Sequence, residues 1–572
     1  MTEKLIKNYS SQNFFMIGLI IMIAAAIRLK TNFSADLIPG INGGYYPLLA
    51  RNILETGSMN YPDAPLVHWL CASLGAIIQL VTGLSIDNAL IASARLIDSL
   101  IPPLVAVPVY FLSKQVYPVM EKPEPARYII PAFTALYLAS LMVLSGDMTK
   151  NSVGLVLLAA FLLHSIRFFQ YRKAKYILFA IIFLILTGIT HIGCLAVAFA
   201  FILISSSVSL IRSAQKKIFR NFSIIMLAIL LFISVSLLLL RSDPDRLTRV
   251  TSFYLNPLRI FETPYLFLLM NGQHPYSGFL WHNFLIINIL SFSGLIILIK
   301  YRGRIQNHEQ VPTWGLAILS LALSSPMIGI EWALRYHLMA WLPIALLYVF
   351  ILRALPGYLL KNATLWVFAA LVLFSAIAGI TGKRMTSITR ESYQDLWNIP
   401  SVQIISENDL VVARHGLEWW TGWVLNCHTG KEYCLVPADW NKYPQIFLLR
   451  QKKGNNYPGH QGGGQFAEFP VPPGSTLVYS SVFFDLYRLE APSTKDYYRG
   501  DLPLVQGTIR TTGAGQILIE SEGYLQRVSL SPGIQLPDLP ADSIQEGKQA
   551  DIWGRRVPFS LKIKAETIRI YR

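Results

Sequence analysis

The chain's apolar residues gather in long runs, and this feature most restricts what it can fold into. Of its 572 residues, 53% are hydrophobic and only 14% are charged. Many runs approach the length of a helix that crosses a bilayer, roughly 20 residues. We therefore predict a polytopic α-helical membrane protein.

Counted outward from a cytoplasmic N-terminus, the apolar runs predict about eleven transmembrane helices. The first run follows Lys4 and Lys7 and has no small-residue cleavage site after it, so we interpret it as an anchor. The predicted spans lie near residues 13–30, 93–112, 128–145, 152–168, 176–192, 193–211, 222–240, 278–299, 312–330, 333–353 and 363–381.

The stretch Pro65–Leu84 is also apolar, but charge argues against counting it as a span. If it lies outside as an interfacial helix, four basic segments fall in the cytoplasm, as the positive-inside bias prefers. Topology thus explains most of the net charge of +16, and we expect no nucleic-acid partner. The basic segments are 114–127, 167–175, 212–220 and 300–304.

The composition divides the chain into three parts. Residues 1–382 form the predicted transmembrane domain, with a first outer loop at 31–92. Residues 383–495 mix helix and strand patterns and predict an extracytoplasmic α/β domain. Residues 496–572 contain short alternating strands and predict a small β-barrel, which we expect to pack against its neighbour.

Cys427 and Cys434 lie seven residues apart in the predicted outer domain. An oxidising compartment favours a disulfide between cysteines placed in this way. We therefore predict a Cys427–Cys434 bridge.

Several short motifs occur along the chain. In order, they are the acidic and aromatic first outer loop, Arg51–Gly57, Pro65–Trp69, Pro102-Pro103, Ser145-Gly146-Asp147, Thr190-His191, Arg335-Tyr336 and Glu418-Trp419-Trp420. In this order the motifs resemble the GT-C superfamily of membrane glycosyltransferases, which includes oligosaccharyltransferase catalytic subunits and aminoarabinose and mannosyl transferases. The resemblance extends over most of the chain and rests on the order of the motifs.

Sugar transfer from a polyprenyl phosphate needs a carboxylate that deprotonates the acceptor or holds a cation, and a cation that stabilises the phosphate. The resemblance makes Asp147 the first catalytic candidate, followed by Asp63 and Asp36. Asp147 and Asp63 each precede a predicted helix, so helix N-capping is an alternative role for both. Lys150, three residues after Asp147, joins the expected substrate-binding residues.

The aromatic pair Tyr45-Tyr46 follows Asn42, which stands where many members of the family have an acid. Asn can form hydrogen bonds but cannot act as a base at neutral pH. We place Asn42, Tyr45 and Tyr46 among the substrate-binding residues, and we expect another carboxylate to supply the base.

Arg335 is the candidate for the donor phosphate, because its planar guanidinium can bind two phosphate oxygens. Glu331 and Tyr336 beside it belong to the same expected site. The alternative is an interfacial arginine that lies in an aromatic belt or pairs with Glu331.

Trp419 and Trp420 are expected to contact substrate, with a buried tryptophan pair as the alternative. Thr421 follows them where oligosaccharyltransferases have an acid, which argues against recognition of an asparagine-linked acceptor.

The expected function is transfer of a sugar or glycan from a polyprenyl-phosphate-linked donor to a lipid, polysaccharide or protein at the outer face of the cytoplasmic (inner) membrane. The expected partners are that donor, the acceptor and membrane lipids. A divalent metal, Mg or Mn, is a possible cofactor at Asp147. The alternatives are a catalytically silent GT-C scaffold in envelope glycan assembly, which Asn42 supports, and, further from the pattern, a transporter or flippase.

Overall fold

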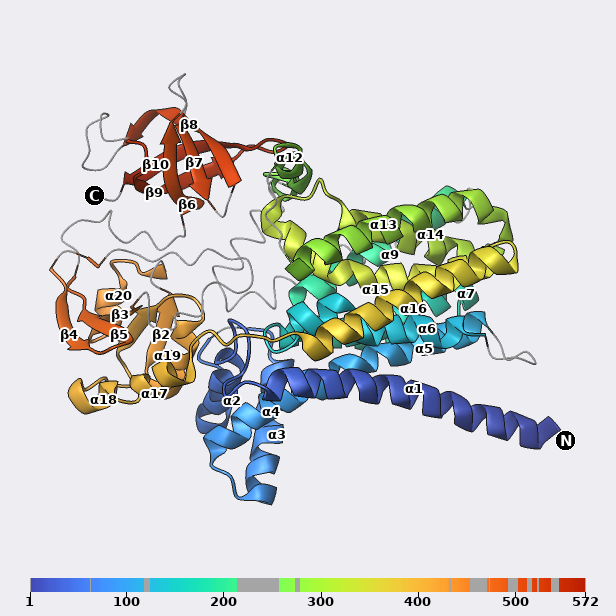
Figure 1. Ribbon diagram of the computed structural model, residues 1–572, viewed down its shortest axis with the longest axis horizontal. Helices are drawn as coiled ribbons and strands as arrows, with labels where there is room; N and C mark the ends of the chain where they lie inside the picture. Colours follow the sequence, from blue (N-terminus) through green and yellow to red (C-terminus); the bar gives the residue numbers. More distant parts are fainter. Residues whose placement is uncertain are drawn as a thin grey trace.

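In a computed structural model, the chain forms a bundle of long helices with two strand-rich regions beside one end of it (Figure 1). The structure describes residues 2–61, 63–117, 124–212, 257–272, 278–431, 434–452, 471–472, 474–491, 503–511, 517–521, 524–535 and 545–570.

The bundle consists mainly of helices that run roughly parallel or antiparallel to one another (Figure 1). Its long members are α1 (Thr2–Phe33), α5 (Ala106–Val116), α6 (Ala126–Leu136), α7 (Thr149–Tyr171), α8 (Ala174–Gly188), α9 (Ile192–Arg212), α13 (Gly278–Tyr301), α14 (Asn307–Ser324), α15 (Ile330–Ala354) and α16 (Tyr358–Thr381). Short helical segments connect or extend them, namely η1 (Pro102–Val105), η2 (Ser140–Leu144), η4 (Pro257–Phe261), α12 (Tyr265–Met270) and η5 (Arg302–Arg304).

In the described part of the chain, eight helical stretches are long and apolar enough to cross a membrane. They are Phe14–Phe33, Ile86–Val116, Ala126–Leu144, Thr149–Tyr171, Ile192–Arg212, Gly278–Arg304, Trp332–Ala354 and Tyr358–Thr381. This result is compatible with a multi-pass membrane protein.

The sequence predicted more spans than these eight stretches. Helices α8 and α14 coincide with the predicted spans 176–192 and 312–330, but α8 has 15 residues and α14 begins at the polar Asn307. The predicted span 222–240 lies outside the described residues. The predicted span 93–112 contains a break, because Pro102 and Pro103 lack amide hydrogens and η1 separates α4 (Ile86–Leu100) from α5.

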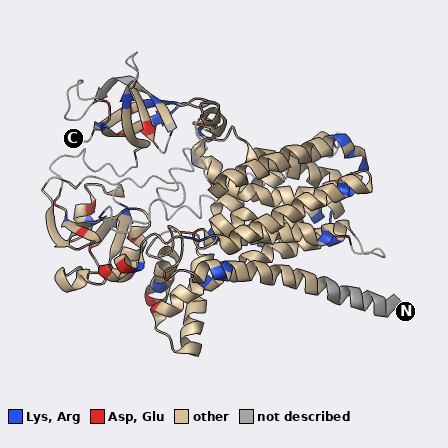
Figure 2. Cartoon of the chain, viewed as in Figure 1, with Lys and Arg blue, Asp and Glu red and all other residues tan. Residues whose placement is uncertain are grey.

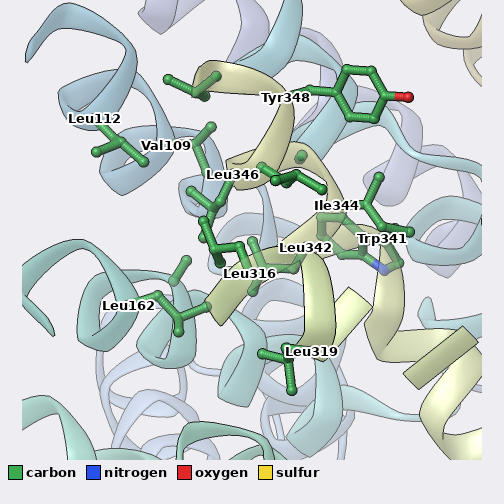
Figure 3. Packing of buried hydrophobic residues seen from close by; sticks show 14 of the residues in the cluster. Val109, Leu112, Leu162, Leu316, Leu319, Trp341, Leu342, Ile344, Leu346 and Tyr348 are labelled. Carbon is green, nitrogen blue, oxygen red and sulfur yellow. The ribbon is translucent and has the colours of Figure 1, made fainter. Parts of the chain in front are cut away.

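A large apolar cluster fills the bundle. Figure 3 shows part of it, where Leu316 and Leu319 of α14 lie near Trp341, Leu342 and Leu346 of α15. These side chains are at most 1% exposed. The bundle thus has a close-packed interior whether its outer surface meets lipid or water.

Basic residues are concentrated at the end of the bundle that points away from the strands (Figure 2). The connections after α5, α7 and α13 lie at this end, and two ion pairs, Arg353–Glu309 and Lys361–Glu124, also tie helices together there. The described parts of the basic segments therefore share one end, as the predicted topology requires.

The first outer loop forms α2 (Tyr45–Thr56), α3 (Leu66–Thr82) and the first residues of α4 (Ile86–Leu100) at the opposite end, and the rest of α4 belongs to the candidate span Ile86–Val116. Helix α3 covers the predicted interfacial stretch and runs across the direction of the bundle (Figure 1). One face of α3 packs on α4, where a Cβ on Gly75 would lie 2.5 Å from Leu90. Its other face exposes Trp69, Ile77 and Leu80. The helix is confirmed, and its contact with lipid stays a prediction.

The chain after α16 forms the predicted mixed domain, with a sheet in the order β2-β1-β3-β5-β4. Strand β1 pairs parallel with β2 and β3, and the other pairs are antiparallel. The elements are α17 (Arg390–Leu396), α18 (Ile399–Val402), β1 (Leu410–Ala413), α19 (Leu417–Leu425), β2 (His428–Lys431), α20 (Asp439–Lys442), β3 (Ile446–Gln451), β4 (Thr476–Ser480) and β5 (Phe484–Arg488).

The last region is a closed barrel in the order β10-β8-β7-β6-β9, as the sequence predicted. Strands β8 and β10 pair parallel and the others antiparallel, which is the connectivity of an OB-type barrel. The strands are β6 (Val505–Thr511), β7 (Ile517–Ser521), β8 (Tyr524–Gln535), β9 (Gln549–Arg556) and β10 (Lys562–Ile570).

One apolar cluster joins the first outer loop to the mixed domain. It contains Tyr45 and Leu49 of α2 together with Val411 of β1 and Trp420 of α19. The outer loop and the sheet therefore share a core, and this places α19 beside the start of α2.

We expect the two ends of the bundle to face opposite sides of a membrane. In a background with Cys427 and Cys434 changed to Ser, Lys383→Cys should react with an impermeant thiol reagent in intact cells. Lys173→Cys and Gly303→Cys should react only after the membrane is opened. Labelling of position 173 or 303 in intact cells would contradict this arrangement.

Candidate functional site

A buried ion pair fixes the turn that carries Asp147. Oδ1 of Asp98 lies 3.0 Å from Nη2 of Arg28, and both side chains are at most 2% exposed. Oδ2 of Asp98 accepts from Nδ2 of Asn32 at 2.7 Å and from the Gly146 amide at 2.8 Å. Gly146 has a φ of 78°, a conformation that favours glycine. Asp98 therefore holds both α1 and the turn in place.

Asp147 itself is held by the first outer loop. Its Oδ1 accepts from the amide of Asn42 at 2.9 Å and from Nδ2 of Asn42 at 3.0 Å. Its Oδ2 lies 3.9 Å from Nη2 of Arg384. A Cβ on Gly40 would lie 2.4 Å from the Asp147 Cβ, so only glycine allows this approach. Asn42 therefore positions a carboxylate from another segment.

Asp63 forms a second buried centre with Lys150. The Lys150 ammonium and the Tyr45 hydroxyl both donate to Oδ2 of Asp63. Nε2 of His68 lies 3.6 Å from the same oxygen. The Asp63 side chain is 1% exposed, and the Lys150 side chain is 13% exposed. The negative charge of Asp63 is thus compensated by a cation from the start of α7.

Neither aspartate is the N-cap that the sequence offered as an alternative. The N-cap of α7 is Met148 and that of α3 is Pro65, and neither makes a side-chain capping hydrogen bond. Asp63 accepts instead from the Ala64 amide at 2.7 Å. The capping interpretation is therefore wrong for both Asp147 and Asp63.

Tyr46 connects the two carboxylate centres. Its hydroxyl accepts from the Lys150 amide at 3.3 Å and donates to the Asp147 carbonyl at 3.5 Å. Its ring stacks on His68 with 5.7 Å between centroids. Burial raises the pKa of Tyr46 well above its usual range, so the hydroxyl stays protonated.

Trp419 reaches the site from the mixed domain. Its ring lies 4.7 Å from Tyr45 and 5.6 Å from Tyr61, measured between centroids. A Cβ on Gly44 would lie 3.0 Å from the Trp420 amide, so the absence of a side chain at 44 allows α19 to approach. The site is therefore built from the first outer loop, the start of α7 and α19.

Other expected site residues lie elsewhere. Asp36 is exposed and its Oδ2 lies 3.6 Å from Nη1 of Arg390, as in an ordinary surface ion pair. The Trp420 side chain is fully buried, and its Nε1 donates to Oγ of Ser387 at 3.1 Å. The buried-core interpretation therefore holds for Trp420, whereas Trp419 is only half-buried.

Arg335 lies near the beginning of α15 with an exposed side chain. Tyr336 is half-buried and packs against the bundle core. The side chain of Glu331 is outside the described residues. Neither Arg335 nor Tyr336 is among the contacts of Asp63 and Asp147 given above, and their role in phosphate binding stays a prediction.

The structure does not form the predicted disulfide between Cys427 and Cys434. Strand β2 lies between the two cysteines, and its extended backbone carries the chain away from Cys427. Burial raises the pKa of the Cys427 thiol to about 12, which keeps it protonated and unreactive.

Sequence reasoning missed Arg28, Asp98, His68 and Arg384. The sequence did contain an indication of Arg28 and Asp98, because Arg28 directly follows the first apolar run and Asp98 lies inside the second. A charge at such a position needs a partner, so an arginine and an aspartate in adjacent spans predict a pair. Arg384 gave no such signal, because it lies beyond a span end where basic residues are common.

Comparison with known proteins adds no family assignment. The sequence matches no protein-family model, and no curated protein is significantly similar to it. Among the described residues, no group of three His, Cys, Asp or Glu side chains is placed to hold a metal ion.

Lys150→Met should lower the thermal unfolding midpoint of the purified protein, because it leaves Asp63 buried without its cation, at a cost of roughly 3–5 kcal/mol. Adding Asp63→Asn to Lys150→Met should restore most of the midpoint. Asp36→Asn, which changes an exposed carboxylate, should have almost no effect. A double variant that is less stable than Lys150→Met would show that the pair is not coupled in this way.

Proposed function

We propose that the chain is a membrane glycosyltransferase that moves a sugar or glycan from a polyprenyl-phosphate-linked donor to an acceptor on the outer face of the cytoplasmic membrane. The observation that carries this proposal is the meeting of Asp147, Asp63, Lys150 and Trp419 at one end of the bundle. These residues come from three segments that are distant in sequence. The resemblance in motif order supports the same reaction.

Asp147 is the proposed base. Asn42 occupies Oδ1, so the carboxylate is fixed in orientation, and among the described contacts Oδ2 has only Arg384 at 3.9 Å. Oδ2 is therefore the oxygen that can accept a proton from an acceptor hydroxyl or amine. Asp63 is less suited to this role, because Lys150 and Tyr45 already bind its Oδ2.

Positive charge for the donor phosphate comes from Arg384, which lies beside Asp147, whereas the charge of Lys150 is matched by Asp63. Arg384 is held by hydrogen bonds from its guanidinium to the carbonyls of Met142 and Val143. Burial lowers the pKa of Arg384, and the nearby Asp147 and Asp98 oppose this effect. A fixed cation beside the breaking bond stabilises the leaving phosphate without reorganisation. If the reaction uses a divalent metal, Mg or Mn, Asp147 is the residue that would hold it.

The aromatic wall formed by Tyr45, Tyr61 and Trp419 supports a sugar substrate. Flat aromatic faces pack against apolar faces of sugar rings. The hydroxyls of Tyr45 and Tyr61 are bound to Asp63 and Thr429, but Nε1 of Trp419 has no hydrogen-bond partner among the described residues. We therefore place the donor sugar against Trp419, on the side of the mixed domain.

The second candidate is a catalytically silent scaffold, and the pairing of Asp63 with Lys150 favours it. A carboxylate and an ammonium that neutralise each other can stabilise a fold without any chemistry. A transporter is less well supported, because these polar groups gather at one end of the bundle rather than along its middle.

Asp147→Asn should keep the hydrogen bonds from Asn42 and delete the charge. If Asp147 is the base, transfer should fall by roughly 100-fold or more while protein abundance stays near wild type. The measurement is the amount of polyprenyl-phosphate-linked glycan in cells that lack the chain and carry each variant. Asp36→Asn is the control and should behave as wild type. Full complementation by Asp147→Asn would favour the scaffold.

Arg335→Lys keeps the charge but loses the two-pronged guanidinium. If Arg335 binds the donor phosphate, the same lipid-carrier assay should show strongly impaired transfer at normal protein abundance. If this variant transfers sugar at the wild-type level, Arg335 is instead an interfacial residue in an aromatic belt.

A further inference from the structure

The hairpin between β9 and β10 attaches the barrel to the helical bundle. The Phe559 amide donates to the Phe261 carbonyl at 3.0 Å, and the two rings stack with 4.9 Å between centroids. Phe261 ends η4, a segment that also binds the start of α15 through a hydrogen bond from the Gly329 amide to Ile260. The hairpin therefore lies beside the outer end of a candidate span.

Four basic residues surround the base of this hairpin: Arg527, Arg555, Lys562 and Lys564, which we call the hairpin patch. All four side chains are exposed. Within the described part of the chain, none of them takes part in an ion pair of 4.0 Å or less. The nearest acid along β10 is Glu566, so the patch keeps a clear positive excess.

Strand register places these like charges opposite one another. Lys562 is the direct partner of Arg527 in the parallel β8–β10 pair, and Lys564 is the direct partner of Arg555 in the antiparallel β9–β10 pair. Like charges in directly opposed positions destabilise a sheet. The barrel thus carries a repulsion that a bound anion would relieve.

Exposed apolar side chains accompany the hairpin patch. Phe559 at the hairpin tip is 47% exposed, Leu258 of η4 is 49% exposed, and Met270 at the end of α12 is 75% exposed. Basic residues interleaved with exposed apolar ones are typical of surfaces that bind anionic bilayers. A soluble acidic polysaccharide would not require the apolar part of this surface.

We propose that the hairpin patch binds anionic phospholipid headgroups and so holds the barrel against the membrane surface. Each basic residue near an anionic surface adds to the attraction, which acts within a Debye length and is therefore weakened by salt. This binding is independent of the sugar-transfer reaction, and it requires only that the bundle lies in a membrane.

The test uses the full chain in nanodiscs of phosphatidylcholine alone or with phosphatidylglycerol. In a background with Cys427 and Cys434 changed to Ser, a fluorophore on Ser560→Cys reports the approach of the hairpin to lipids that carry a quencher. We expect at least twofold stronger quenching in the anionic nanodiscs, and we expect high salt to weaken it.

Lys562→Glu/Lys564→Glu should abolish the dependence on anionic lipid, and Lys562→Gln/Lys564→Gln should reduce it with less risk to folding. Lys442→Glu/Lys548→Glu is the matched control, because Lys548 lies at the other end of β9 and Lys442 lies in the mixed domain. Equal quenching in both lipid mixtures would overturn the proposal. Binding of the hairpin patch to a soluble acidic polysaccharide, with no effect of lipid charge, would also overturn it.

Discussion

The pair Arg28–Asp98 is the interaction on which the rest of the structure depends. It joins α1 to α4, and the hydrogen bonds of Asp98 continue to Asn32 and to the turn at Gly146. A buried charge pair is costly unless its polar atoms have partners, so the contacts of Arg28 and Asp98 restrict the geometry around them. The first helix, the first outer loop and the turn before α7 are thereby fixed relative to one another.

The candidate site follows from that restriction. With the turn in place, Asp147 accepts a hydrogen bond from Asn42, and Lys150 forms an ion pair with Asp63. Two polar pairs therefore join the first outer loop to the turn and to the start of α7. The mixed domain completes the site through Trp419, because the absence of a side chain at Gly44 leaves room for α19 to pack closely against the first outer loop. Two aspartates thereby have different roles: Asp63 is neutralised in place, and Asp147 keeps one oxygen less engaged.

Much of this fold follows from the sequence. The apolar runs predicted the bundle, the alternating C-terminal strands predicted the closed barrel, and the apolar stretch Pro65–Leu84 predicted a helix. The sequence predicted part of the residues of the site. Those that do lie together are Asp147, Asp63, Lys150, Asn42, Tyr45, Tyr46 and Trp419. Asp36 and Trp420 do not join them, because the sequence could not show which side of a loop or helix faces the site. The roles of these residues in a reaction stay predictions.

The central claim is that a polyprenyl-phosphate-linked glycan binds beside Trp419, and photocrosslinking tests it most directly. A benzophenone amino acid would replace Trp419 in membranes that contain a labelled polyprenyl-phosphate-linked glycan, and Trp397, which is 47% exposed on the mixed domain, would be replaced as the control. The account predicts a labelled adduct at position 419 that excess unlabelled donor removes, and no adduct at 397. An equal yield at both positions, or none at 419, would contradict it.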